Sequence, residues 1–182
     1  IRRQRQMCIR DRFLTAVFNA LSISFPKGEK FFMNSVRAFK DDVSKEMSED
    51  IRIFCIQEAT HTREHIKYNK LLCELKGYDV EQLESIFAKK LEKSYSPKVD
   101  NKIRLAITTA MEHITASMGA SMLKGNLVKS DNPVADMWKW HSLEEVEHKS
   151  VAYDVYKAVN GSDKVMRIVM KLALIDMIHA NT

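Results

Sequence analysis

Two predicted helices each carry a glutamate followed three positions later by a histidine: Glu58-Ala-Thr-His61 and Glu145-Val-Glu-His148. In an α-helix, side chains three positions apart point to the same side. That side is otherwise largely apolar, with Phe54 among its members, so both motifs are expected to face the protein interior. A buried carboxylate is costly unless it gains a proton, a partner or a metal ion. Only a fold that brings several helices together supplies such partners.

Apolar periodicity predicts long helices along most of the chain and no sheet. Five glycines and three prolines are few for 182 residues, which favours helices over a turn-rich β fold. The predicted segments are a helix after a turn at Pro26 and Gly28, a helix from an N-cap at Ser48 to Gly77, a short helix at 80–95, and helices at 102–125, 134–159 and 161–178. The one long connection lies between the second and third long helices. The expected fold is therefore all-α: a ferritin-like four-helix bundle with one long crossover and an additional C-terminal helix.

Each of the four long helices directs a glutamate along its apolar face. In addition to the two motifs, the first helix contributes Glu29 and the third contributes Glu112. One glutamate from each of two helices, with Glu-x-x-His from each of the other two, is the ligand pattern of di-iron and di-manganese carboxylate bundles. The predicted metal ligands are Glu29, Glu58, His61, Glu112, His141, Glu145 and His148.

Two of these seven residues have alternatives. Glu29 is predicted at the very start of its helix, where a glutamate also interacts favourably with the helix N-terminus. Glu46 and Glu49 are the substitutes for it. His141 lies one turn before Glu145 and is a candidate third nitrogen ligand.

Further polar residues lie beside the predicted ligands. His65, His113 and Glu144 are candidate hydrogen-bonding partners of the ligands or catalytic bases. The small side chains around Glu112, among them Gly119, either leave space for a substrate or allow close helix packing. His179 is assigned no role.

The net charge of +5 does not indicate a nucleic-acid partner. Residues 1–12 hold five arginines and one aspartate and account for +4 of it. This segment resembles translated sequencing-adapter read-through and is predicted to be a non-native tail; a native basic tail is the alternative. Residues 13–182 are predicted to form a single helical dimetal-binding domain, truncated at its C-terminus.

The chain shows neither a signal peptide nor an apolar run of about 18 residues, so we expect no integral membrane segment and a cytoplasmic protein. Cys55 and Cys73 lie on one predicted helix about 27 Å apart at 1.5 Å per residue, and cannot form a disulfide within it. A reducing compartment agrees with this.

Four segments resemble a known family: "GEKFFMNSVRAF", "FCIQEATHTREHIKYN", "AITTAMEHITA" and "WKWHSLEEVEHKSVAYDVY". Over residues 24–170 the chain is similar to the ferritin-like bacterial proteins catalogued as predicted metal-dependent hydrolases. The fourth helix also resembles the ligand helix of di-iron arylamine N-oxygenases, in which a histidine, a glutamate four positions on and a histidine three positions further match His141, Glu145 and His148. The other helices of that family match Glu58, His61 and Glu112. Both resemblances imply a dimetal enzyme.

Three functions follow from these observations. The leading prediction is an oxygen-activating oxidase or oxygenase with two metal ions, iron being favoured over manganese or zinc, acting on a small organic substrate. The alternative is a metal-dependent hydrolase that uses a metal-activated water. The third is a non-catalytic metal-binding or structural bundle. The substrate and the oligomeric state do not follow from the sequence.

Overall fold

The computed structural model describes residues 12–96, 98–125 and 133–179, and within them the chain forms helices and no strand. The all-α prediction is confirmed. The helices are α1 (Arg12–Arg37), α2 (Lys45–Lys76), α3 (Val80–Tyr95), α4 (Asn101–Gly125), α5 (Pro133–His148), α6 (Val151–Ala158) and α7 (Asp163–His179). The predicted tail, apart from Arg12, lies outside the described residues.

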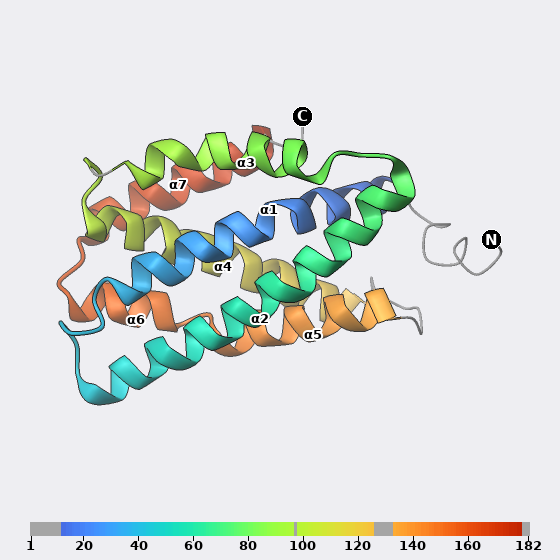
Figure 1. The fold of residues 1–182 in the computed structure, drawn as a ribbon. Coiled ribbons are helices and arrows are strands. Elements are labelled where there is room, and N and C mark those ends of the chain that lie inside the picture. The colour runs from blue at the N-terminus through green and yellow to red at the C-terminus, as the bar shows by residue number, and fades with distance from the viewer. Residues whose placement is uncertain (1–11, 97, 126–132, 180–182) are drawn as a thin grey trace.

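Four helical rods form the bundle: α1, α2, α4, and α5 continued by α6 (Figure 1). Helix α1 packs along α2, and α4 packs along α5 and α6. Helix α3 runs back across the bundle beside α1 and connects the end of α2 to the start of α4, so it forms the long crossover. Helix α7 covers α4 on the outside. No helix formed by the described residues is long and apolar enough to cross a membrane.

The predicted turn at Pro26 and Gly28 is wrong, because α1 continues through both residues to Arg37. Local helix propensity is a weak preference that tertiary packing overrides. Pro26 and Gly28 are buried, and a Cβ on Gly28 would make only ordinary contact with Phe87 of α3, at 3.9 Å. Glu29 therefore lies inside a long helix. The N-terminal interpretation of this glutamate is also wrong.

Helix α2 begins earlier than predicted. Its N-cap is Ser44, whose Oγ accepts a hydrogen bond from the Met47 N–H at 3.2 Å. The predicted cap, Ser48, lies within the helix and donates its N–H to the Ser44 carbonyl at 2.8 Å. The predicted end is confirmed: Gly77 has a φ of 70°, a left-handed conformation that glycine adopts without steric cost, and its N–H bonds the Cys73 carbonyl.

The single helix predicted for 134–159 is two helices, because a turn at Lys149 and Ser150 separates α5 from α6. Neither residue is a glycine or proline, so no local helix-breaking signal marks the interruption. The buried residues of α6 (Ala152, Val155 and Tyr156) join the apolar core at that end of the bundle.

The small residues around Glu112 bring helices together. A Cβ on Gly119 would lie 2.9 Å from the Ser142 carbonyl oxygen, so α5 packs directly on the glycine backbone. Thr108 forms a 2.6 Å hydrogen bond with Ser35 of α1. At these two positions the structure supports close helix packing rather than open space for a substrate.

Candidate metal centre

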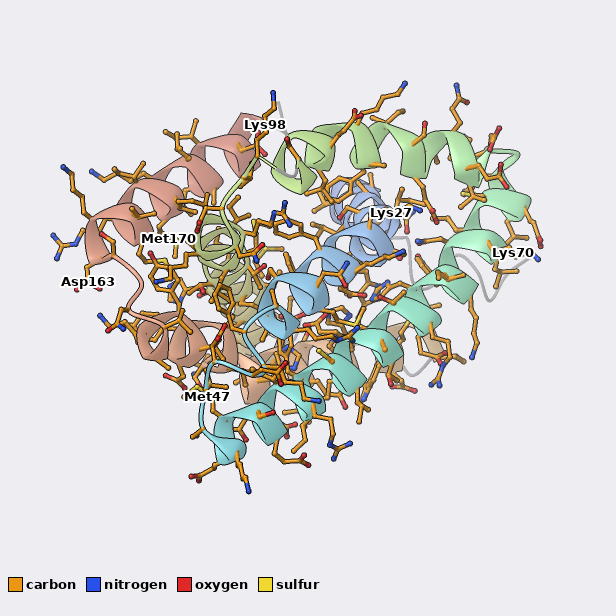
Figure 2. All side chains as sticks on the ribbon, turned by 60° about the vertical axis from the view of Figure 1, so that its left-hand side comes forward. Lys27, Met47, Lys70, Lys98, Asp163 and Met170 are labelled. Carbon is orange, nitrogen blue, oxygen red and sulfur yellow. The ribbon has the colours of Figure 1, made fainter. Side chains whose placement is uncertain are left out.

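The structure brings the seven predicted ligands into one interior region between α1, α2, α4 and α5. All are buried, with exposed fractions between 0% and 4%. In Figure 2 the side chains of Lys70 and Asp163 extend outward from their helices, whereas other side chains fill the space between the helices. The seven residues are Glu29, Glu58, His61, Glu112, His141, Glu145 and His148.

Three groups of these side chains have their ligand atoms within 4.8 Å of one another. The groups are Glu58, Glu112 and His148; Glu29, Glu58 and His61; and His61, His141 and Glu145. A fourth group joins His65 to Glu29 and His141. Because Glu58 belongs to the first two groups and His61 to the second and third, the groups form one continuous cluster.

Glutamates from α2 and α4 surround the Nε2 atom of His148 on α5. This nitrogen lies 3.2 Å from Glu58 Oε1 and 3.5 Å from Glu112 Oε2. Nδ1 of His61 lies 3.8 Å from Glu58 Oε2 and 3.9 Å from Glu145 Oε1. The facing atoms are close to one another, yet their geometry does not make hydrogen bonds.

Several of these buried atoms have no hydrogen-bond partner among the residues that the structure describes. They are Glu29 Oε1, both carboxylate oxygens of Glu58 and of Glu112, His61 Nδ1 and His148 Nε2. Buried polar atoms in native proteins are almost always satisfied. Carboxylate oxygens and imidazole nitrogens that converge without partners are the donor set that divalent transition metals require. The residues present therefore fit metal ions.

In His61 and His148, the ring nitrogen that points away from the cluster has a hydrogen-bond partner. His61 Nε2 lies 2.9 Å from Glu144 Oε2, and His148 Nδ1 lies 3.2 Å from Gln57 Oε1. An acceptor on the outer nitrogen holds the N–H there and leaves a lone pair on the inner nitrogen. The sequence indicated Glu144 as such a partner but not Gln57. No signal identified Gln57, because its bond to His148 joins residues far apart in the chain.

Two threonines hold carboxylates of the cluster. Thr62 donates to Glu29 Oε2 at 2.7 Å, and Thr115 donates to Glu145 Oε2 at 2.6 Å. In both cases the bonded oxygen is fixed between helices and its carboxylate is oriented. The sequence analysis missed both threonines; their positions next to His61 and three after Glu112 were the only available signal.

Burial, together with the crowding of acids, raises the pKa of two carboxyls well above the ordinary 4.5. For Glu29 the main cause is burial, followed by the charge of Glu58. For Glu112 it is again burial, followed by the charges of Glu58 and Glu145. Without metal, these groups gain from holding protons, because several carboxylates share one dry region.

Burial acts to lower the pKa of three histidines, but the net shifts differ. It lowers the pKa of His141 well below 6.5, and that of His65 to about 2, in both cases with help from neighbouring imidazoles. For His61 the contact with Glu58 and the charges of Glu145 and Glu144 outweigh burial and raise the pKa. The lowered pKa values favour the neutral forms of His65 and His141.

The other predicted polar residues lie at different distances from the cluster. His65 is fully buried beside His141, whereas His113 is exposed on the outer side of α4, in a groove against α1 and α7. Glu46 is exposed, and Glu49 is exposed and paired with Arg52 at 2.6 Å, so the structure excludes both as substitutes for Glu29.

An all-α bundle with a buried cluster of carboxylates and imidazoles belongs to the metal-binding class of helical proteins. The chain belongs to the family described as "Predicted metal-dependent hydrolase", whose model matches residues 2–182. The predicted family is thereby confirmed, and so is the expectation of a metal-dependent enzyme. The match agrees with the hydrolytic alternative and gives no support to the predicted oxygen-activating reaction. No curated protein and no solved structure matches the chain.

Proposed function

We propose that this protein is a hydrolase that uses metal ions held at the cluster of Glu29, Glu58, His61, Glu112, His141, Glu145 and His148. The observation that carries the proposal is the set of buried, unpartnered oxygens and nitrogens that face one another from different helices. The family description supports the hydrolytic reaction. We further propose two ions, because the four carboxylates and the two histidines of the Glu-x-x-His motifs match the ligand pattern of dimetal bundles.

The protein residues have distinct tasks in this proposal. Glu58 shares one ligand group with Glu29 and His61 and another with Glu112 and His148, so its carboxylate is the candidate bridge between two ions. Thr62 and Thr115 orient the carboxylates of Glu29 and Glu145. A divalent metal ion in such a centre supplies Lewis acidity and acidifies water.

Glu144 is the candidate group for moving protons. Its Oε2 contacts His61 Nε2 at 2.9 Å, and its side chain is 22% exposed, so one carboxylate contacts both a histidine of the cluster and the solvent. His65 does not suit this role, because hydrogen bonds occupy both of its ring nitrogens inside the bundle. His113 does not suit it either, since it is exposed on the outer side of α4.

A second candidate, oxidation by dioxygen, is favoured by one observation: every proposed ligand is at most 4% exposed. A closed interior admits a diatomic gas more easily than an ester or amide. Iron would be the metal for this reaction, and the carboxylate-rich ligand set suits it.

One experiment separates the two candidates. The purified protein is stripped of metal and reloaded with Mn²⁺, Zn²⁺ or, without oxygen, Fe²⁺, and is then tested on a panel of ester, amide and phosphoester substrates. Hydrolysis that Mn²⁺ or Zn²⁺ restores supports the first proposal. If no metal restores hydrolysis and only the Fe²⁺ protein consumes oxygen, with a change in its optical spectrum, the second function replaces the first.

A further inference from the structure

Pro26 leaves one carbonyl of α1 without its regular helical partner. In an α-helix the carbonyl of Ser22 would accept a hydrogen bond from the N–H of residue 26, and proline has no N–H. The side chain of Asn69, on α2, replaces this bond: its Nδ2 donates to the Ser22 carbonyl at 2.8 Å. Both residues are fully buried. A carbonyl oxygen only accepts, so this bond fixes which end of the Asn69 amide carries the nitrogen.

The orientation of Asn69 determines how the Ser22 hydroxyl points. With Nδ2 on the carbonyl, Asn69 Oδ1 faces Ser22 Oγ at 2.5 Å, and an amide oxygen has no proton to give. Ser22 must therefore donate its single hydroxyl proton to Asn69. Ser22 Oγ also lies 2.8 Å from His65 Nδ1. Since the hydroxyl proton is already used, His65 Nδ1 must carry a proton and donate it to Ser22.

The same reasoning extends from His65 to His141. A neutral imidazole with a proton on Nδ1 has a lone pair on Nε2. His65 Nε2 lies 2.7 Å from His141 Nδ1, so His141 Nδ1 is the donor in this contact. That leaves Nε2, which lies 2.8 Å from Glu145 Oε1, as the nitrogen of His141 that faces the cluster.

We propose that Asn69, Ser22 and His65 form a directional hydrogen-bond chain that holds a proton on His141 Nδ1, so that Nε2 is the nitrogen directed at the metal centre. The proposal rests on the proposed function, since it gives His141 the role of a ligand. The three are positioning residues: they act through His141 and do not contact the metal themselves. His141 thereby resembles His61 and His148, whose outer ring nitrogens contact Glu144 and Gln57.

A protonated His65 would reverse the direction of the chain, and its surroundings argue against this. Its side chain is fully buried, and its ring nitrogens bond a hydroxyl and a second imidazole, while the Glu29 carboxyl, within 4.8 Å, takes its hydrogen bond from Thr62 instead. The rings of Phe25 and Trp138 lie against it, with centroids at 4.8 Å and 5.2 Å. Burying a cation in such surroundings is costly. Because both nitrogens are engaged, His65 is also not a metal ligand in this arrangement.

The test reads the tautomers directly in the metal-free wild-type protein. Long-range ¹H–¹⁵N correlation spectra of histidine-labelled protein distinguish the protonated from the bare ring nitrogen, and His65→Asn and His141→Asn variants assign the signals. We expect protons on Nδ1 of both residues and none on Nε2 of His65. A proton on His65 Nε2, or a bare Nδ1 on either residue, overturns the proposal. Because this measurement needs no metal, it stands even if the proposed function fails.

A variant pair tests the effect on binding. Ser22→Ala removes the acceptor of His65 and should mix the tautomers of His141 and weaken Mn²⁺ affinity, measured by calorimetry, by about 10-fold. Ser24→Ala is the matched control, since Ser24 Oγ bonds only the nearby Leu21 carbonyl, at 2.7 Å, and should leave both readouts unchanged. A folded Ser22→Ala protein with wild-type tautomers and affinity contradicts the proposal. If Ser22→Ala does not fold, the wild-type spectra decide. If wild type binds no Mn²⁺ although the tautomers are as expected, the proposed function fails and the hydrogen-bond chain does not.

Discussion

Glu144 Oε2 lies 2.9 Å from His61 Nε2, on the side of the imidazole that faces away from the carboxylate cluster. The two residues come from α5 and α2, so the contact joins two helices as well as orienting a ring. The other ring nitrogen of His61, Nδ1, faces the cluster and lacks a hydrogen-bond partner among the described residues. A partly exposed acid thus determines which nitrogen of a buried histidine is available.

We expect Glu144→Ala to weaken metal binding by about 10- to 100-fold, the usual effect of removing the partner of a ligating histidine. Glu144→Gln keeps an oxygen acceptor and should lose less. Glu147→Ala, on the exposed side of the same helix, is the control and should bind as wild type does. Titration of the metal-free proteins with Mn²⁺ measures all three, and equal affinities of wild type and Glu144→Ala would contradict the expected role.

Removing a proposed ligand should have a larger effect. Wild type is expected to carry about two metal ions per chain, and Glu58→Ala or Glu145→Ala should lose most of them. Elemental analysis of the purified proteins beside Glu147→Ala checks this, with circular dichroism to show that each variant is folded. If both variants fold and retain the wild-type metal content, the centre does not lie at these residues.

Glu29 and Glu112 should make the metal-free protein less stable as the pH rises. The folded-state pKa values of Glu29 and Glu112 lie well above the ordinary 4.5. Their contribution to stability is therefore full below about pH 4.5 and is lost as the pH rises through the raised values. Glu112→Gln, which mimics a permanently neutral carboxyl, should raise the melting temperature of the metal-free protein at pH 8 and also weaken its metal binding.

His65 and His141 have the opposite effect on how stability depends on pH. The pKa values of His65 and His141 are lowered, so their contribution is present above about pH 6.5 and is lost as the pH falls. Both proteins share this histidine contribution. It therefore cancels in the difference between the melting temperatures of wild type and Glu112→Gln at each pH. If Glu112→Gln is less stable than wild type at pH 8 without metal, the buried carboxyl of Glu112 does not destabilise the metal-free fold.

Two glycine substitutions should act in opposite directions. Gly119→Ala places a Cβ 2.9 Å from the Ser142 carbonyl oxygen and forces α4 and α5 apart, which should cost about 1–3 kcal/mol. Gly28→Ala adds a methyl group in ordinary contact with Phe87 and removes a glycine from a helix interior, which should stabilise by about 0.5–1 kcal/mol. Chemical denaturation measures both. A Gly119→Ala protein as stable as wild type would contradict the close approach of the two helices.

Much of the candidate site was predictable because its ligands follow helical spacing. Glu58 and His61, like Glu145 and His148, share a face by virtue of a three-residue separation, and the apolar neighbours show that this face is buried. The course of α1 through Pro26 was not predictable, because proline and glycine are local helix-breaking signals and the packing that overrides them comes from α2 and α3. The same error put Glu29 at a helix end.

The sequence by itself determined the all-α fold, its connectivity and the face on which each candidate ligand lies, because these depend on the spacing of residues along one helix. Only the tertiary structure decided which atoms meet. The contacts of Thr62 with Glu29, Gln57 with His148 and Ser22 with His65 each join residues of different helices. Such contacts depend on how far each helix slides and turns against its neighbour, and helical periodicity contains no information on that displacement.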